Sequence, residues 1–344
     1  MVGLGYKVLV ADKCVFTRID ANGYLIIVAV YMDDFLFISK SLKFVESSKS
    51  EMSSHFEMKD LGPEKWILQM ELNHDILNGV TTLSQSQYIE EILERHGMAN
   101  SRPVKTPMDP NMTLLSLAVP EIDVTEYQQY VGLLMHAMVW TRPDIAHAVG
   151  MVSRHAAAPG QAHMTAVKRI FRYLRGTSDY KLTYRRDKAG ELVVYSDSDW
   201  AGDKMDRKLT SGFVTMLNGG PVVWGSKKQA STSLSSTEAE FIASTSATQE
   251  LIWLRGLLSS INHLSRTTTS LLIDNQGAIS LIKNSLSSKH SKHIELHYYF
   301  ICEKFTDGTI AAKYISTEKQ LADGLTKALA GIKYKKFVKG LGFT

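Results

Sequence analysis

The stretch LVVYSDSDWAGD, at residues 192–203, decides the fold of the second half of the chain. Its apolar start predicts a short strand at 192–196, and Asp197 follows directly at the end of that strand. Two more short strands are predicted at 212–217 and 222–226, separated by turns rich in Gly and Asp. The second half of the chain therefore begins as a run of short strands.

Helices and further strands continue this pattern toward the end of the chain. The cluster SSTE at 235–238 is typical of a helix N-terminus and predicts a long helix that ends near Leu258. The later elements are a strand at 270–273, helices at 275–283 and 292–305, a strand at 309–315 and a helix at 318–329. The order βββαβααβα predicts a mixed sheet covered by helices, and so an α/β (α+β) fold class.

The first half of the chain combines a hairpin with several helices. Two apolar runs at 25–38 flank the turn Tyr31–Asp34, which predicts a β-hairpin with two carboxylates at its tip. Those carboxylates are either turn residues or metal ligands. Further strands are predicted at 66–72 and 80–83, helices at 42–56, 84–96, 126–140, 145–157 and 162–175, and a linker at 101–123, which holds four of the eight prolines.

Composition narrows the class of protein. The 344 residues suffice for two or three domains, and no apolar run is long enough to span a membrane. The two cysteines, Cys14 and Cys302, cannot build a disulfide framework or a cysteine zinc site, so we expect a reducing interior compartment. The net charge of +4 is modest, but two groups of basic residues stand out. The first runs from 163 to 188 and the second lies at the chain end: Lys168, Arg169, Arg172, Arg175, Lys181, Arg185, Arg186, Lys188; Lys333, Lys335, Lys336, Lys339. Each is either a solvated helix face or a surface that follows phosphates.

Carboxylates occur where predicted elements end. Asp197 and Asp274 each follow a strand, Glu238 lies in the first turn of the long helix, and Asp323 lies at the last helix. Ligand sites in α/β sheets gather beyond strand ends, and carboxylate oxygens suit hard divalent cations. Each residue alone could equally serve as a turn or cap residue. Together the four predict a site for two such ions, which could hydrolyse a phosphodiester.

The long helix contains a second glutamate, and helical spacing separates the two. Phe241 and Thr245 follow Glu238 on one predicted helix face, so we expect Glu238 to face the sheet. On the same reasoning Glu240 points roughly the other way and should matter far less.

Several motifs together resemble the C-terminal part of the Pol polyprotein of copia-type LTR retrotransposons, where reverse transcriptase ends and ribonuclease H follows. The resemblance covers nearly the whole chain, and its motifs occur in the family's order. They are YMDD at 31–34, FEMKDLG at 56–62, RPDIA at 142–146, YSDSDWAGD at 195–203, RKLTSG at 207–212, SSTEAE at 235–240, DNQ at 274–276, KHI at 292–294, and QLAD at 320–323 followed by LTK at 325–327.

The resemblance implies a role for each matching residue. Asp197, Glu238, Asp274 and Asp323 match the ribonuclease H acidic residues, which hold two Mg²⁺ ions, with Mn²⁺ as an alternative. Asp33 and Asp34 match the polymerase pair, and 66–72 resembles the primer-gripping strand. We expect nucleic-acid contacts from a set of basic residues: Lys168, Arg169, Arg172, Arg175, Arg207, Lys227 and Lys228.

The same resemblance implies domains, partners and location. The expected domains are a partial reverse-transcriptase palm at 1–83, thumb and connection helices at 84–183, a ribonuclease H-like domain at 184–330 and a basic tail at 331–344. The implied partners are an RNA–DNA hybrid and a template–primer, with no membrane, in a cytoplasmic particle or the nucleus. The polymerase part is expected to be incomplete and to require the preceding reverse-transcriptase segment.

Some features leave alternatives open. The third polymerase carboxylate has no match upstream of Tyr31, and the loop at 315–320 lacks the histidine that cellular ribonucleases H carry there. His290, His293 and His297 permit a zinc hypothesis, although structural or hybrid-contacting roles are favoured. The alternative to an active ribonuclease H is a catalytically dead nucleic-acid-binding remnant of a decayed element.

Overall fold

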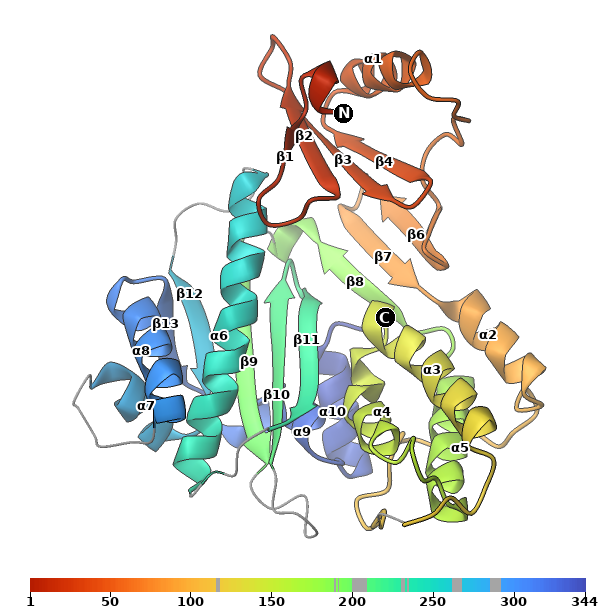
Figure 1. Ribbon diagram of the computed structural model, residues 1–344, viewed down its shortest axis with the longest axis vertical. Helices are drawn as coiled ribbons and strands as arrows, with labels where there is room; N and C mark the ends of the chain where they lie inside the picture. The colour runs from red at the N-terminus through yellow and green to blue at the C-terminus, as the bar shows by residue number, and fades with distance from the viewer. Residues whose placement is uncertain are drawn as a thin grey trace. The chain divides into compact units, whose positions relative to one another are not determined.

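The chain is divided into two compact units in a computed structural model (Figure 1). Unit 1 comprises residues 1–65 and 249–267, and unit 2 comprises residues 66–248 and 268–344. The described residues are 1–115, 118–188, 190, 192–199, 209–229, 233, 235–261, 268–284 and 292–344, without the side chains of 292–298. No helix in these ranges has the length and apolar character needed to cross a membrane.

Unit 1 contains a four-stranded antiparallel sheet in the order β1-β2-β3-β4. The elements are η1 (Val2–Leu4), β1 (Lys7–Val8), β2 (Val15–Ile19), β3 (Leu25–Tyr31), β4 (Asp34–Ser39) and α1 (Leu42–Ser53). Because side chains alternate along a strand, Ile26 and Val28 share one face, where they are buried with Phe44 and Met52 of α1. The predicted hairpin is confirmed: β3 pairs with β4 around a turn in which Met32 adopts a φ of 50°.

Unit 2 begins with a second antiparallel sheet, in the order β5-β6-β7-β8. Its strands are β5 (Trp66–Ile67), β6 (Met70–Asp75), β7 (Val80–Ser84) and β8 (Lys181–Arg185), and η3 (Arg186–Lys188) follows β8. The prediction of one strand at 66–72 was wrong. Leu68 and Gln69 have φ values of 51° and 63°, so the chain reverses between β5 and β6 as a tight hairpin.

The helices of the middle region pack together in one core with the end of the chain. They are α2 (Ser86–Arg95), α3 (Val124–Trp140), η2 (Pro143–Ile145), α4 (Ala146–Ser153) and α5 (Gln161–Arg175). The expected basic tail is instead a helix, α10 (Gly331–Gly340), whose Tyr334 and Phe337 are buried in this core. Its lysines lie on the exposed face. The apolar spacing of 334, 337, 338 and 341 explains this docking, since these side chains share one helix face.

The second half of unit 2 contains the predicted mixed sheet. Its strands are β9 (Leu192–Asp199), β10 (Thr210–Leu217), β11 (Gly220–Lys228), β12 (Thr269–Ile273) and β13 (Ile310–Tyr314), in the order β11-β10-β9-β12-β13. The first three strands pair antiparallel, whereas β12 lies parallel to both β9 and β13. The five strands and the α/β class expected from the sequence are confirmed.

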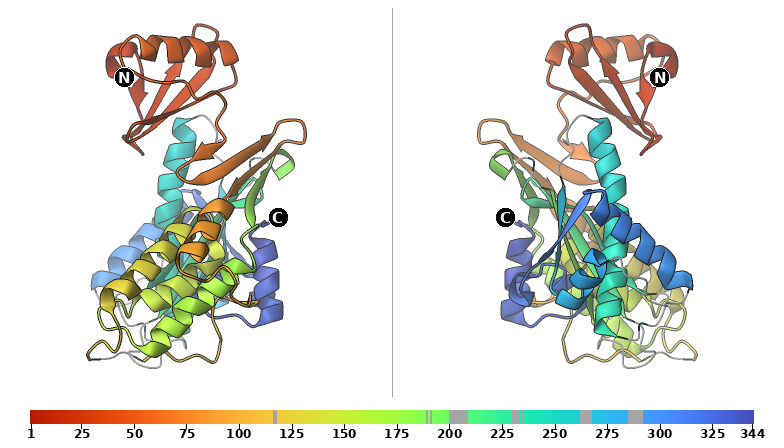
Figure 2. Two further views of the ribbon diagram at one scale, coloured as in Figure 1. Left: turned by 90° about the vertical axis from the view of Figure 1, so that its right-hand side faces the viewer. Right: turned by 90° about the vertical axis from the view of Figure 1, so that its left-hand side faces the viewer.

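Helices lie on both faces of this sheet. They are α6 (Ser236–Ser260), α7 (Gln276–Lys283), α8 (Lys292–Thr306), η4 (Thr317–Lys319) and α9 (Asp323–Thr326). The two views in Figure 2 place the first half of α6 and α10 on opposite faces of the sheet. The single helix expected at 318–329 is broken into η4 and the short α9, between which Gln320 leaves the helical region at ψ 107°.

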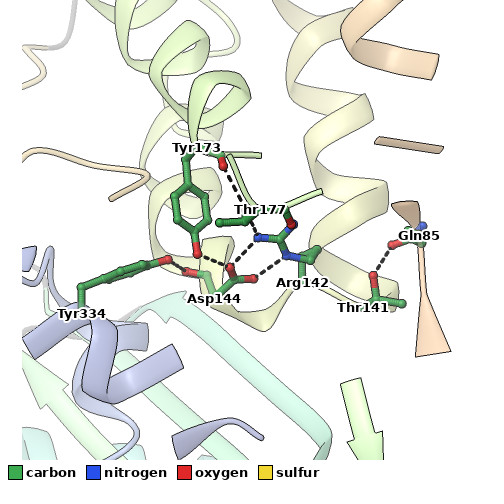
Figure 3. A network of polar contacts seen from close by, with 7 residues as sticks. All are labelled: Gln85, Thr141, Arg142, Asp144, Tyr173, Thr177 and Tyr334. Atoms are coloured by element: carbon green, nitrogen blue, oxygen red, sulfur yellow. Dashed lines mark hydrogen bonds and ion pairs between the residues drawn. The ribbon is translucent and has the colours of Figure 1, made fainter. Parts of the chain in front are cut away.

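A buried ion pair joins the middle helices to α10 (Figure 3). Arg142 donates to both oxygens of Asp144, at 2.9 and 2.7 Å, and neither side chain is exposed. The guanidinium also donates to Thr177, at its carbonyl and hydroxyl oxygens, and the Tyr173 hydroxyl donates to Asp144 at 2.6 Å. The Tyr334 hydroxyl of α10 donates to the Asp144 carbonyl oxygen at 3.0 Å. Each charge in this pair is therefore matched and hydrogen-bonded.

Candidate metal centre

Three aspartates from three elements meet at one edge of the five-stranded sheet. Asp197 lies near the end of β9, Asp274 directly follows β12, and Asp323 is the first residue of α9. Because β9 and β12 run parallel, their carboxyl ends share an edge, which brings Asp197 and Asp274 together. One carboxylate oxygen from each aspartate lies within 4.8 Å of the others. The structure thus brings together three of the four residues expected from the sequence, which we call the carboxylate cluster.

Two glycines let α9 fit closely between the sheet and α10. Gly212 lies opposite Asp197 in the β9–β10 register, and a Cβ there would come within 2.7 Å of Thr326. On the other side of α9, a Cβ on Gly324 would come within 2.5 Å of the Phe337 ring of α10. A side chain at Gly212 would push α9 away from the sheet, and one at Gly324 would push α9 and α10 apart. The glycine of the RKLTSG motif therefore lets Asp323 and Thr326 reach Asp197.

Hydrogen bonds hold the aspartates in place. The Thr326 hydroxyl donates to Asp197 Oδ2, and the Thr317 hydroxyl donates to Asp274 Oδ2 at 2.8 Å. The Gln320 amide donates to the Ser196 carbonyl oxygen at 3.0 Å, which fixes the segment before α9 on β9. These bonds leave other carboxylate oxygens available to a ligand.

The long helix buries Glu240 against β9, whereas helical spacing predicted that Glu238 would face the sheet. Glu240 is 6% exposed and accepts a hydrogen bond from the Ser198 backbone N–H at 3.1 Å through Oε1. Its Oε2 has no hydrogen-bond partner among the described residues. Glu238 is half-buried, and its backbone N–H donates to the Ser235 hydroxyl at the helix start.

A signal in the sequence could have identified Glu240. Ser244 and Ala247 follow it at i+4 and i+7, and both are fully buried. These small residues allow α6 to lie close to the sheet. The bulkier Phe241 and Thr245 had instead led to the prediction that the face of Glu238 packs on the sheet. Both faces of this part of the helix are buried, so apolar spacing alone could not separate the two glutamates.

Burial and mutual repulsion disfavour full ionisation of Glu240, Asp197 and Asp323. Burial raises the pKa of Glu240 to about 9, and the charges of Asp197 and Asp274 add to the effect. Burial also raises the pKa of Asp197 to about 7, helped by Asp323 and Asp274 and opposed by Lys327 and Thr326. The pKa of Asp323 is raised as well, again chiefly by burial. A divalent cation would relieve this repulsion.

Most of the expected nucleic-acid contacts on α5 already have partners within the protein. Arg172 and Arg175 donate to the Arg102 and Ala99 carbonyl oxygens at 2.7 and 2.6 Å, and Arg169 donates to the Thr106 hydroxyl at 3.1 Å. The three arginines therefore hold the segment 99–106 against α5, whereas Lys168 is exposed. This gives a structural reason for a basic helix face that the sequence left open.

The structure gives positions for some, but not all, of the other residues that were expected at functional sites. Lys227 and Lys228 end β11, in the register rows of Ser211 and Thr210. Arg207 and His290 lie outside the described residues, as do the side chains of His293 and His297. Asp33 and Asp34 are exposed in unit 1, and in the described ranges no third metal-ligating side chain gathers with them.

Comparison with known proteins matches the chain to reverse transcriptases and transposon proteins. A family model described as reverse transcriptase (RNA-dependent DNA polymerase) matches residues 1–110. The retrovirus-related Pol polyprotein from transposon TNT 1-94 of Nicotiana tabacum is 39% identical over 94% of this chain. The match covers 25% of that protein, so the chain spans about a quarter of the length of this relative.

A shorter relative and a solved structure match parts of the chain. The putative transposon Ty5-1 protein YCL074W of Saccharomyces cerevisiae is 33% identical, over 66% of this chain and 74% of that protein. A solved ribonuclease H1 isolated from compost, LC11-RNase H1, matches 40% of this chain and 93% of its own, at 17% identity and a TM-score of 0.32.

Proposed function

The chain belongs to the Pol proteins of copia-type LTR retrotransposons, and we propose that its unit 2 hydrolyses the RNA strand of RNA–DNA hybrids as a ribonuclease H. The observation that carries this proposal is the gathering of Asp197, Asp274 and Asp323 within 4.8 Å, with Glu240 buried beside them. Four carboxylates from four elements have no structural reason to meet, because burying like charges together is costly.

The donor set fits hard divalent cations. It consists of carboxylate oxygens, the ligands that Mg²⁺ and Mn²⁺ prefer, and Glu240 contributes a buried oxygen with no hydrogen-bond partner among the described residues. We propose that Asp197, Glu240, Asp274 and Asp323 hold two such ions, Mg²⁺ in the first place. When bound, the ions would supply an activated water and stabilise the leaving oxygen of a phosphodiester.

The protein's own part in this reaction is to fix the ligands. Thr326 and Thr317 orient Asp197 and Asp274 through hydroxyl hydrogen bonds, and the Ser198 N–H orients Glu240. Gln320 ties the segment before Asp323 to β9. Positions fixed in advance reduce the reorganisation that a developing charge requires, which is how such sites accelerate hydrolysis.

We propose that the hybrid contacts this site through backbone phosphates. Lys168, Lys227 and Lys228 remain the expected phosphate contacts in the described chain, and Arg207 is a further one by its position in the RKLTSG motif. Such contacts position a nucleic acid without reading its bases, so the site would cut hybrids of many sequences.

A cleavage assay tests this function. The purified chain is incubated with an RNA–DNA hybrid labelled on the RNA strand, with Mg²⁺ or with EDTA, and RNA duplex and DNA duplex serve as substrate controls. We expect cuts in the RNA of the hybrid that need Mg²⁺, and a loss of about 100-fold or more in Asp274→Asn. Hybrid binding without any cleavage would identify a nucleic-acid-binding protein instead.

A further inference from the structure

One basic side chain lies against the carboxylate cluster. Lys327 directly follows α9, four residues after Asp323, and its Nζ is 3.0 Å from Asp323 Oδ1 and 4.0 Å from Asp197 Oδ2. In the described part of the chain, no other Lys or Arg has an ion pair with the four carboxylates. A single ammonium thus stands against a site with an excess of negative charge.

The ammonium of Lys327 is held less firmly than the guanidinium of Arg142, whose side chain is fully buried. The Lys327 side chain is 36% exposed, on a flexible stem whose tip can move into water. Its two carboxylate partners are the same aspartates that would ligate a metal. An ammonium and a divalent cation cannot both occupy these oxygens at close range, since like charges a few ångströms apart repel strongly in a partly buried site.

We propose that Lys327 is a positioning residue that holds the carboxylates together in the metal-free protein and releases them when a divalent cation binds. This inference rests on the proposed function to the extent that the cluster binds a metal. Lys327 thus competes with the divalent cation for the same carboxylates. The lysine stabilises the metal-free site and weakens the apparent affinity for the ion. Its removal therefore has opposite effects on the two states.

Calorimetric titration with Mn²⁺, in the absence of nucleic acid, measures one of these effects. Lys327→Met keeps the stem and removes the charge, Lys327→Gln is a second neutral variant, and Lys327→Arg keeps the charge. Lys319→Met is the matched control, because Lys319 is an exposed lysine of η4 near the site. We expect the two neutral variants to bind Mn²⁺ about 3- to 10-fold more tightly than wild type, with Lys327→Arg and the control within about twofold.

Thermal unfolding in EDTA measures the other effect. Without the ammonium, Asp323 and Asp197 lose their counter-charge, so the neutral variants should unfold a few degrees below wild type, whereas the control should not. Neutral variants that bind Mn²⁺ no more tightly than wild type, or that unfold in EDTA at the wild-type temperature, would overturn the inference. Absence of Mn²⁺ binding in wild type itself is a separate result, which overturns the metal site and the inference together.

Discussion

Among the described residues of unit 2, charged side chains are buried in two places, which differ in how their charges are matched. Arg142 and Asp144 form a pair in which donors and acceptors are satisfied by Thr177, Tyr173 and each other. The carboxylate cluster and Glu240 instead bring four acidic groups together against the partly exposed ammonium of Lys327.

The difference separates a structural group from a ligand site. A matched ion pair gains nothing from an added ion, and its hydrogen bonds fix η2, α5 and α10 relative to one another. An excess of negative charge destabilises the folded protein until a cation binds. Removing the Arg142 charge should therefore destabilise the metal-free protein, whereas removing one of the clustered negative charges should stabilise it.

The largest effect is expected from Arg142→Met. The substitution leaves the buried Asp144 carboxylate without its counter-charge, which costs about 3–5 kcal/mol in comparable buried pairs. The free energy of unfolding from a urea titration measures this loss, with the exposed Lys168→Met as control. A loss below about 1 kcal/mol would show that the network does not hold the middle helices and α10 together.

Glu240→Gln should change the free energy of unfolding of the metal-free protein in the opposite direction. Glutamine keeps the acceptor for the Ser198 N–H and removes a buried charge beside Asp197 and Asp274. We expect a gain of roughly 1–2 kcal/mol in the free energy of unfolding in EDTA near pH 9. Destabilisation of the metal-free protein by this variant would mean that Glu240 has a structural partner.

The cluster also predicts how stability depends on pH. The folded-state pKa values of Asp197 and Glu240, about 7 and about 9, lie above those of the unfolded chain, so the folded state retains protons that the unfolded state has released. Stability in EDTA should fall as pH rises from about 4 to 9. Thermal unfolding across this range checks it: Glu240→Gln should flatten the upper part of the curve, and saturating Mn²⁺ should offset the loss.

The smallest effect is expected from Tyr334→Phe. This change removes one hydrogen bond, from the Tyr334 hydroxyl to the Asp144 carbonyl oxygen, and retains the ring contact with Phe337. A loss of about 1 kcal/mol in urea unfolding is typical of such a bond. A loss as large as that of Arg142→Met would mean that the anchoring of α10 depends on this hydroxyl more than on its apolar face.

Much of the fold was predictable because regular alternation and helix capping are local signals. The hairpin around Met32 and the five-stranded sheet follow from apolar runs bounded by turn residues. The hairpin at 66–75 was missed because Leu68 and Gln69 take a left-handed conformation without a glycine to announce it. The docking of α10 was missed because its four lysines obscured the apolar face that includes Tyr334 and Phe337.

The site was predictable where it depends on strand ends and not where it depends on packing. Asp197 and Asp274 follow from the rule that ligands gather beyond strand ends, and they do lie together. Glu240 depends on which face of a helix buried on two sides meets the cluster, which local spacing does not determine. Lys327 was quoted only as part of the LTK motif, because its four-residue spacing from Asp323 does not show that Asp197 lies beside the same ammonium.

We propose that Glu240, and not Glu238, completes the metal centre. The most direct test is the rate at which Glu240→Gln and Glu238→Gln, measured side by side with wild type, cut the RNA of a labelled hybrid at saturating Mg²⁺. We expect a loss of about 100-fold or more for Glu240→Gln and a change within about threefold for Glu238→Gln. The reverse order, or equal rates for the two variants, would contradict it.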